Sequence, residues 1–278
     1  MRGLAGRPGR VVAGPREARP PGVEVRSLGG FEVLVDGRSV PLAAWRSRKA
    51  RDVLKLLVAA RGRRVAREHL LETLWPDEDP ERSGPRLSVA LSTVRGVLDR
   101  SKQQPADHYL AADRSSVWLR REHLTVDLER FLERAAEGLE AASRRRPEAQ
   151  QVLVEAEALY RGDFLAEDLY EDWAVGTREE ARNVYQRTAS ALARLAVDAG
   201  EHEAAAGYLW RLIERDPWDE AAHLELVRVL AASGRQGEAR RAYRRYVSRM
   251  SELGVESAPF PVPEQRGSGV PPRVGTTS

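Results

Sequence analysis

The chain has 278 residues, 42% of them hydrophobic, which predicts one to three domains with apolar cores and excludes a wholly disordered protein. It contains no cysteine, so disulfides and thiolate chemistry are excluded. No apolar run approaches the roughly 18 residues that span a bilayer, and the Arg-rich start lacks the apolar segment of a signal peptide, so we expect a cytoplasmic protein.

The net charge of +3 conceals a strong asymmetry between the two halves of the chain. Residues 1–123 contain 24 Lys+Arg against 15 Asp+Glu, whereas residues 124–278 contain 21 against 27. A basic front half predicts contact with nucleic acid, and an acidic back half predicts a different task.

The front of the chain predicts an arm, a hairpin and two helices. Residues 1–22 are rich in Gly, Pro and Arg and are expected to be disordered. Strands follow over residues 23–42, with a hairpin turn at Asp36-Gly37 and a return strand at Val40 and Leu42. A helix over residues 48–60 is expected to start at Ser47 as N-cap. A second helix covers residues 66–75, with Ala66 as cap and four inward side chains: Leu70, Leu71, Leu74 and Trp75.

Basic residues surround the first of these helices and have two possible interpretations. They either contact phosphates or form a solvated face, and the sequence does not decide between the two. The group contains Arg46, Arg48, Lys49, Arg51, Lys55, Arg61, Arg63 and Arg64, against the single acid Asp52.

The helix predicted over residues 83–100 carries the strongest functional signal. Its apolar residues Leu87, Ala90, Leu91, Val94 and Leu98 form one stripe. The opposite face is small, hydroxylated and basic, which suits a DNA major groove, although a solvated amphipathic helix has the same pattern. Arg95 is expected either to read guanine bidentately or to contact a phosphate, and Ser92 and Thr93 are expected to contribute less. The expected DNA-binding residues of this helix are Arg86, Ser88, Val89, Ser92, Thr93 and Arg95.

An acidic loop precedes this helix and a hairpin follows it. The loop from Pro76 to Gly84 carries Asp77, Glu78, Asp79 and Glu81. Extended runs on both sides of the turn at residues 112–116 predict the hairpin, which contains Arg114 and Arg120. The order of strands, three helices and hairpin predicts a winged helix-turn-helix over residues 23–123. Its predicted DNA contacts outside the third helix are Arg46, Arg48, Lys49, Arg114 and Arg120.

The back half is predicted to be helical over residues 124–253. A 34-residue period relates Gly200 to Gly234 and Ala205 to Ala239, which is typical of tetratricopeptide helix pairs. Residues 254–278 carry Pro, Gly and Ser without periodicity and are expected to form a disordered tail. The predicted fold is therefore mainly α, with an N-terminal α+β winged helix and an all-α tetratricopeptide-like domain.

This order of motifs resembles the Streptomyces antibiotic regulatory protein family, in which an OmpR-type winged helix precedes a bacterial transcriptional activation domain. The clearest matches are the stretch from Tyr160 to Leu165, the pair Asp172-Trp173, and the Ser-x-x-Arg pattern of Ser92 and Arg95. The resemblance covers roughly residues 23–253. It departs at Gly96, where family members commonly carry Arg or Lys.

The resemblance implies a transcriptional activator. Such a protein would bind direct repeats in double-stranded DNA as a head-to-tail homodimer, and secondary-metabolite gene clusters would be its targets. The loop with Asp77, Glu78, Asp79 and Glu81 would face RNA polymerase holoenzyme, including region 4 of its sigma factor.

An enzyme is not predicted, because the sequence has no constellation for one. The five histidines lack metal-ligand spacing, and neither a phosphate-binding loop nor a G-x-S-x-G motif is present, so we expect no metal and no cofactor. The alternative function is a tetratricopeptide adaptor whose front domain binds protein and not DNA. The basic front half argues against it.

Overall fold

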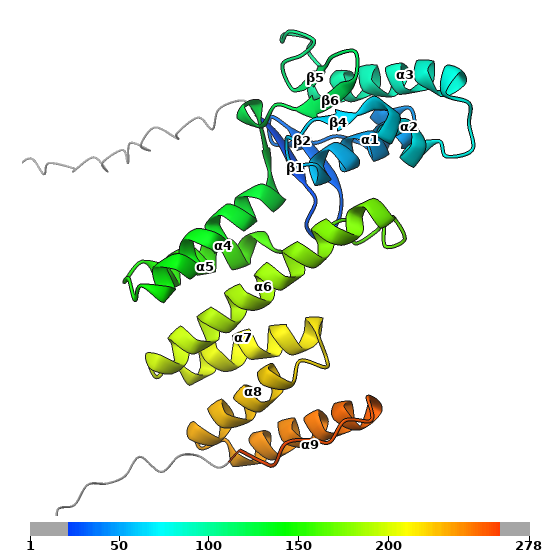
Figure 1. The fold of residues 1–278 in the computed structure, drawn as a ribbon. Helices are drawn as coiled ribbons and strands as arrows, with labels where there is room; N and C mark the ends of the chain where they lie inside the picture. Colours follow the sequence, from blue (N-terminus) through cyan, green and yellow to red (C-terminus); the bar gives the residue numbers. More distant parts are fainter. Residues whose placement is uncertain (1–21, 262–278) are drawn as a thin grey trace, which may run out of the picture. The chain divides into compact units, whose positions relative to one another are not determined.

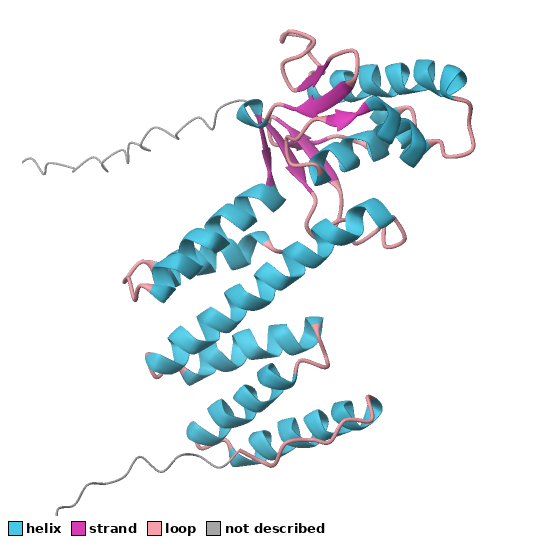
Figure 2. Cartoon of the chain, viewed as in Figure 1, coloured by secondary structure: helices cyan, strands magenta, loops and turns pink. Residues whose placement is uncertain are grey.

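The computed structural model describes residues 22–261, except for the side chains of residues 80–82. The expected arm, apart from Gly22, and the part of the tail beyond residue 261 lie outside the described residues. The chain divides into two compact units, the first ending at Asp127 and the second beginning at Leu128 (Figure 1). All described strands belong to the first unit, and the second unit is helical (Figure 2).

The first unit opens with a four-stranded sheet built on alternating buried valines. Its order is β3-β2-β1-β7, antiparallel between β1 and β2 and parallel between β1 and β7. The last strand is therefore the partner of the first, which extends this unit beyond the expected boundary at residue 123. The strands are β1 (Val23–Arg26), β2 (Glu32–Val35), β3 (Arg38–Ser39) and β7 (Leu124–Val126).

The hairpin turn between β2 and β3 lies at the predicted position. Asp36 and Gly37 have φ angles of 51° and 75°, and positive values at both central residues are what a two-residue turn matching strand twist requires. The expected return strand exists, but it lies earlier than predicted. It is β3, one further main-chain bond runs from the N of Val40 to the Val33 carbonyl at 2.8 Å, and the prediction fails at Leu42, which is 70% exposed and begins the short 3₁₀ helix η1 (Leu42–Trp45).

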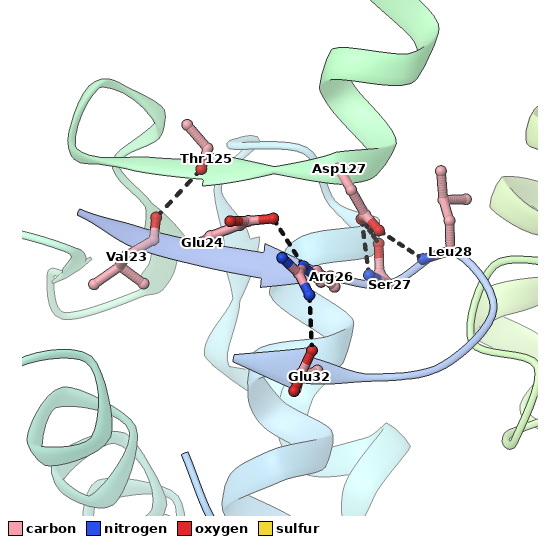
Figure 3. Close-up of polar contacts among 8 residues, drawn as sticks. All are labelled: Val23, Glu24, Arg26, Ser27, Leu28, Glu32, Thr125 and Asp127. Carbon is pink, nitrogen blue, oxygen red and sulfur yellow. Dashed lines mark hydrogen bonds and ion pairs between the residues drawn. The ribbon is translucent and has the colours of Figure 1, made fainter. Parts of the chain in front are cut away.

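A buried carboxylate joins the ends of the neighbouring strands β1 and β7. Asp127 Oδ1 accepts hydrogen bonds from the main-chain N and the Oγ of Ser27, both at 2.8 Å, and Oδ2 accepts one from the N of Leu28 at 3.0 Å (Figure 3). Asp127 and Ser27 are both buried. The contact lies next to the β1–β7 pairing and links residues 100 positions apart.

Three helices and a second sheet complete the first unit. Sheet order β4-β6-β5 places the hairpin of β5 and β6 beside the short strand β4, which precedes the second helix. The hairpin predicted around residues 112–116 is confirmed. The elements are α1 (Arg48–Ala59), β4 (Val65–Ala66), α2 (Arg67–Leu74), α3 (Pro80–Leu98), β5 (Leu110–Ala112), β6 (Ser116–Leu119) and η2 (Arg121–His123).

Details of these helices differ from the sequence prediction. Ser47 occupies the N-cap position of α1 in an extended conformation, but its side chain makes no cap hydrogen bond. Leu71 of α2 is only half-buried. Helix α3 begins at Pro80, so the acidic loop is shorter than expected and ends at Asp79. Proline is well tolerated in the first turn of a helix, which explains the early start.

The second unit consists of helices that follow one another in a stack (Figure 1). Helix α6 packs against α7, and α8 against α9. The 34-residue repeat is confirmed in the geometry: Gly200 and Gly234 end α6 and α8 with φ angles of 76° and 79°, and Ala205 and Ala239 are fully buried. The helices are α4 (Asp127–Ser143), α5 (Ala149–Leu159), α6 (Asp172–Asp198), α7 (His202–Arg215), α8 (Glu220–Ala232) and α9 (Gln236–Glu252).

The first part of the expected tail lies against α9. Tyr246 Oη accepts a hydrogen bond from the main-chain N of Ala258 at 2.7 Å, and Tyr243 Oη donates one to the Ala258 carbonyl at 2.8 Å. The ring of Phe260 packs edge-on against Tyr243. Residues 255–261, which the sequence assigned to a disordered tail, are thus held by two tyrosines that satisfy both polar groups of one residue.

Neither a membrane span nor a metal cluster is found in the part of the chain that the structure describes. Between residues 22 and 261, no helix is long and apolar enough to cross a membrane. Within the same range, no group of three or more His, Asp or Glu is placed to hold a metal ion.

Candidate nucleic-acid interface

Helix α3 has the two faces that its sequence predicts. Leu87, Ala90, Leu91, Val94 and Leu98 are all buried, and so is Val97, which the predicted stripe did not include. We call the opposite side the outer face of α3 and define it by the predicted contacts Arg86, Ser88, Val89, Ser92, Thr93 and Arg95. In this face Arg86, Ser88, Val89 and Ser92 are exposed, while Thr93 and Arg95 are half-buried.

Hydroxyl groups of the outer face bond back to the helix. Ser88 Oγ donates to the carbonyl of Gly84 at 3.2 Å, and Thr93 Oγ1 donates to the carbonyl of Val89 at 3.0 Å. Such bonds to the carbonyl four residues earlier occupy the hydroxyl proton. Both groups can therefore meet a ligand as acceptors without breaking a bond.

Arg95 lies differently from the sequence prediction. Its Nε and Nη2 both donate to the Leu110 carbonyl in β5, each at 3.3 Å. Burial, followed by the positive charge of Arg67, lowers the pKa of this guanidinium from its usual value. Because two of its N–H groups bind inside the protein, Arg95 ties the β5–β6 hairpin to α3, and a bidentate contact with guanine would first have to break that tie.

Arg86 at the other end of the face is also engaged, since its guanidinium forms an ion pair with Glu78 of the acidic loop. Asp77 and Asp79 of the same loop are both exposed, and the main-chain carbonyl of Asp79 accepts hydrogen bonds from the N and Oγ of Ser83. Glu81 belongs to α3, and its side chain lies outside the described part. The expected four-carboxylate surface is thus divided, because Glu78 neutralises a residue of the outer face.

The basic residues around α1 do not form one surface. Lys55 is buried with its Nζ 5.3 Å from the centre of the Phe31 ring, and Arg51 Nη2 donates to the Phe31 carbonyl at 2.8 Å. These two cations contact Phe31, the residue just before β2, and so stabilise the first sheet. Arg46 and Arg48 are exposed at the start of α1, where Arg48 Nε lies 4.0 Å from Asp52.

Lys49, the third residue predicted at this helix start, is half-buried. Its Nζ lies 6.0 Å from the centre of the Trp75 ring, which is itself buried. The structure therefore brings Arg46, Arg48 and Lys49 together, at the beginning of α1.

The hairpin carries its two predicted arginines in different surroundings. Arg114 is exposed in the turn between β5 and β6. Arg120 is half-buried, with Nη2 at 3.1 Å from Asp107 and Nη1 at 3.8 Å from Glu122. Two neighbouring carboxylates make Arg120 a weak candidate for a phosphate contact, whereas Arg114 remains well placed.

Two further arginines contact the turn between β5 and β6. Arg64 Nη1 pairs with Asp113 Oδ2 at 2.6 Å and its guanidinium stacks 3.9 Å from the centre of the Trp118 ring. Arg67 Nη1 donates to the Asp113 carbonyl at 3.4 Å. Main-chain N–H groups of Ser115 and Ser116 hold the pKa of Asp113 below its usual value. Only the pairing of β4 with β6 creates this cluster, so Arg67 and Trp118 had no detectable signal in the sequence.

Comparison with known proteins agrees with the architecture just described. The family described as "Transcriptional regulatory protein, C terminal" matches residues 43–115, and the family described as "Bacterial transcriptional activator domain" matches residues 126–260. Both occur in the order predicted from the motifs. The chain belongs to the Streptomyces antibiotic regulatory protein family.

Relatives of this family member are transcriptional regulators from mycobacteria. The transcriptional regulatory protein EmbR of Mycobacterium tuberculosis is 31% identical over 240 residues, which cover 84% of this chain and 59% of EmbR. The transcriptional regulatory protein MoaR1 of the same organism is 26% identical over 252 residues, covering 85% and 76% of the two chains. The chain thus spans about three fifths of the length of EmbR.

A solved structure supports the fold of this family member. EmbR of Mycobacterium tuberculosis, in complex with a low-affinity phosphopeptide, superposes with a TM-score of 0.69 at 26% identity and covers 86% of this chain and 62% of that one. The fold class predicted from the sequence, a winged helix followed by an all-α domain, is confirmed.

Proposed function

We propose that the protein is a sequence-specific transcriptional activator that binds direct repeats in double-stranded DNA as a head-to-tail homodimer. The observation that carries this proposal is the outer face of α3, which has four exposed side chains, contains no carboxylate and is joined to the β5–β6 hairpin by Arg95. A helix of this kind enters the major groove, and the wing contacts the neighbouring backbone. A secondary-metabolite gene cluster is the proposed target.

The two units have separate tasks in this proposal. The winged helix supplies base contacts from α3 and phosphate contacts from Arg46, Arg48, Lys49 and Arg114. The helical unit holds two copies together on adjacent repeats, so that linked binding raises the affinity above that of one site. The acidic loop contacts RNA polymerase holoenzyme, including region 4 of the sigma factor, because carboxylates suit a basic protein surface and repel phosphates.

A selection experiment tests this function directly. The full chain is used to enrich a randomised duplex pool, and its affinity for the enriched duplex and for unselected duplex is measured over a range of salt concentrations. We expect a consensus of two direct repeats and an enriched duplex bound about 10³-fold more tightly than the pool. A protein-binding adaptor would enrich no sequence, and that outcome would contradict the proposed DNA-binding function.

Phosphate contacts are expected at Arg48 and Arg114. Replacing either by alanine should weaken binding to enriched and unselected duplexes by the same factor, since phosphates carry no sequence information. The slope of log affinity against log salt concentration should become shallower by about 1 for each arginine replaced. Arg144→Ala is the matched control, because that exposed arginine pairs with Glu140 in the helical unit. Weaker binding confined to the enriched duplex would contradict this assignment.

Activation is expected to depend on the acidic loop. Changing Asp77 and Asp79 to Asn together should leave DNA affinity unchanged and reduce transcription from a bound promoter in a purified system, because the loop then loses charge facing the polymerase. Glu78→Gln serves as the contrast. It frees Arg86, so it should alter DNA affinity as well as transcription. Full transcription by the Asp77 and Asp79 double variant would rule out the loop as a polymerase contact.

A further inference from the structure

The outer face of α3 presents one apolar side chain, Val89, among the residues predicted to contact DNA. Val89 is 66% exposed, and in the described part of the first unit the only other exposed large apolar residue is Leu42, in η1. An exposed valine gains free energy when an apolar group covers it, because burying an apolar side chain is worth about 1.5–3 kcal/mol. Val89 therefore has a driving force to meet an apolar group.

The contacts of its neighbours leave Val89 as the apolar readout position of the face, beside the exposed hydroxyl of Ser92. Arg86 is paired with Glu78, and Arg95 is bound to the Leu110 carbonyl. Ser88 and Thr93 use their hydroxyl protons inside the helix. Gly96 is exposed, and a Cβ added there would meet nothing within 4 Å, so this position adds open space and no contact of its own.

The major groove offers one apolar group to such a face, the 5-methyl group of thymine. We propose that Val89 reads a thymine 5-methyl group in each half-site, and that this contact determines specificity in place of a guanine contact from Arg95. The inference rests on the proposed function, since it assumes that α3 enters the groove. It adds the base that this chain selects and the residue that selects it.

The test compares thymine with uracil, which differ in this methyl group alone. The duplex enriched by the full chain is synthesised with thymidine throughout or with deoxyuridine throughout, and affinities of the parent and of Val89→Ala are measured on both. The parent is expected to bind the deoxyuridine duplex about 3- to 10-fold more weakly, which corresponds to the loss of one or two buried methyl groups.

Val89→Ala should weaken binding to the thymidine duplex by a similar factor and should weaken it little further on the deoxyuridine duplex. The two effects are non-additive because both changes remove the same interaction. Val154→Ala, at an exposed valine of α5, should bind both duplexes as the parent does. Single replacements of thymidine along the half-site should then locate the effect at one position.

Each outcome decides the inference. A parent that binds both duplexes equally, or a Val89→Ala variant that is weakened by deoxyuridine as much as the parent is, overturns the thymine contact while leaving DNA binding intact. Failure to enrich any duplex overturns the proposed function instead. Folding does not confuse the result, because Val89 is exposed and alanine has the higher helix propensity; equal melting temperatures of the two proteins verify this.

Discussion

Replacing Asp127 by alanine is expected to destabilise the winged-helix unit by about 3 kcal/mol. The carboxylate is 7% exposed and accepts three hydrogen bonds, from the N and Oγ of Ser27 and the N of Leu28. Alanine would leave these buried donors without a partner and would remove the link between the first and last strands of the sheet. It would also remove a negative charge from the start of α4, where the helix dipole favours one.

The measurement must separate the two units, because a chain with two compact units need not unfold in a single step. Hydrogen exchange followed by mass spectrometry does so: peptides from β1, β2 and β7 should exchange faster in Asp127→Ala, while those from α8 and α9 keep the parent rate. Asp127→Asn should fall between parent and alanine, since its amide keeps one acceptor and sets an N–H against a donor. Asp198→Ala is the control, an exposed acid at the end of α6 whose replacement should change stability by less than about 0.5 kcal/mol. Unchanged exchange in Asp127→Ala would show that the strand pairing holds without this carboxylate.

The second large effect is expected at Arg178 in the helical unit. This arginine is 7% exposed, and all three guanidinium nitrogens donate to carbonyls of the segment before α6: Nε to Phe164 at 3.1 Å, Nη2 to Asp168 at 2.9 Å and Nη1 to Leu169 at 3.5 Å. One cation therefore holds three carbonyls of this loop. Replacing Arg178 by methionine keeps much of the volume and removes every donor, and we expect a loss of about 3 kcal/mol in the stability of the helical unit.

Arg178→Lys is the informative comparison. An ammonium group retains the charge but is a compact point donor, so it cannot span three carbonyls as a planar guanidinium does. We expect an intermediate loss of stability, with cleavage by a protease appearing at Leu169 and Tyr170, which are already 56% and 97% exposed. If the lysine variant is as stable as the parent, the charge alone is sufficient. If the methionine variant is as stable as the parent, the hydrogen bonds of Arg178 to the three carbonyls do not stabilise the unit.

The helical unit also shows how an aromatic and ionic cluster supports the same loop. Tyr160 Oη donates to Asp163 Oδ1 at 2.8 Å, and Asp163 is paired with Arg182 of α6. Burial raises the pKa of Tyr160, and the hydrogen bond to Asp163 adds to this effect. Tyr160 and Asp163 belong to the Tyr160 to Leu165 stretch that carried the family resemblance. The motif therefore has a structural role, because it holds the connection between α5 and α6.

The sequence by itself determined the features that depend on local spacing. A period of 3.6 residues identified the buried stripe of α3, the Asp36-Gly37 pair identified a turn that needs two positive φ angles, and a 34-residue period identified the stacked helix pairs. In each case the pattern is set by neighbours along the chain, and so it can be read without coordinates.

Tertiary structure alone decided which long side chains are available for function. The contact of Asp127 with Ser27 spans 100 residues, and the contact of Arg95 with Leu110 depends on where the hairpin packs. An arginine at the outer edge of a helix has the same sequence pattern whether it faces solvent, a carbonyl or a carboxylate. Its reach of several ångströms lets the fold choose among these partners, which is why Arg95 and Arg86 bind inside the protein and Val89 is the exposed apolar residue of the face.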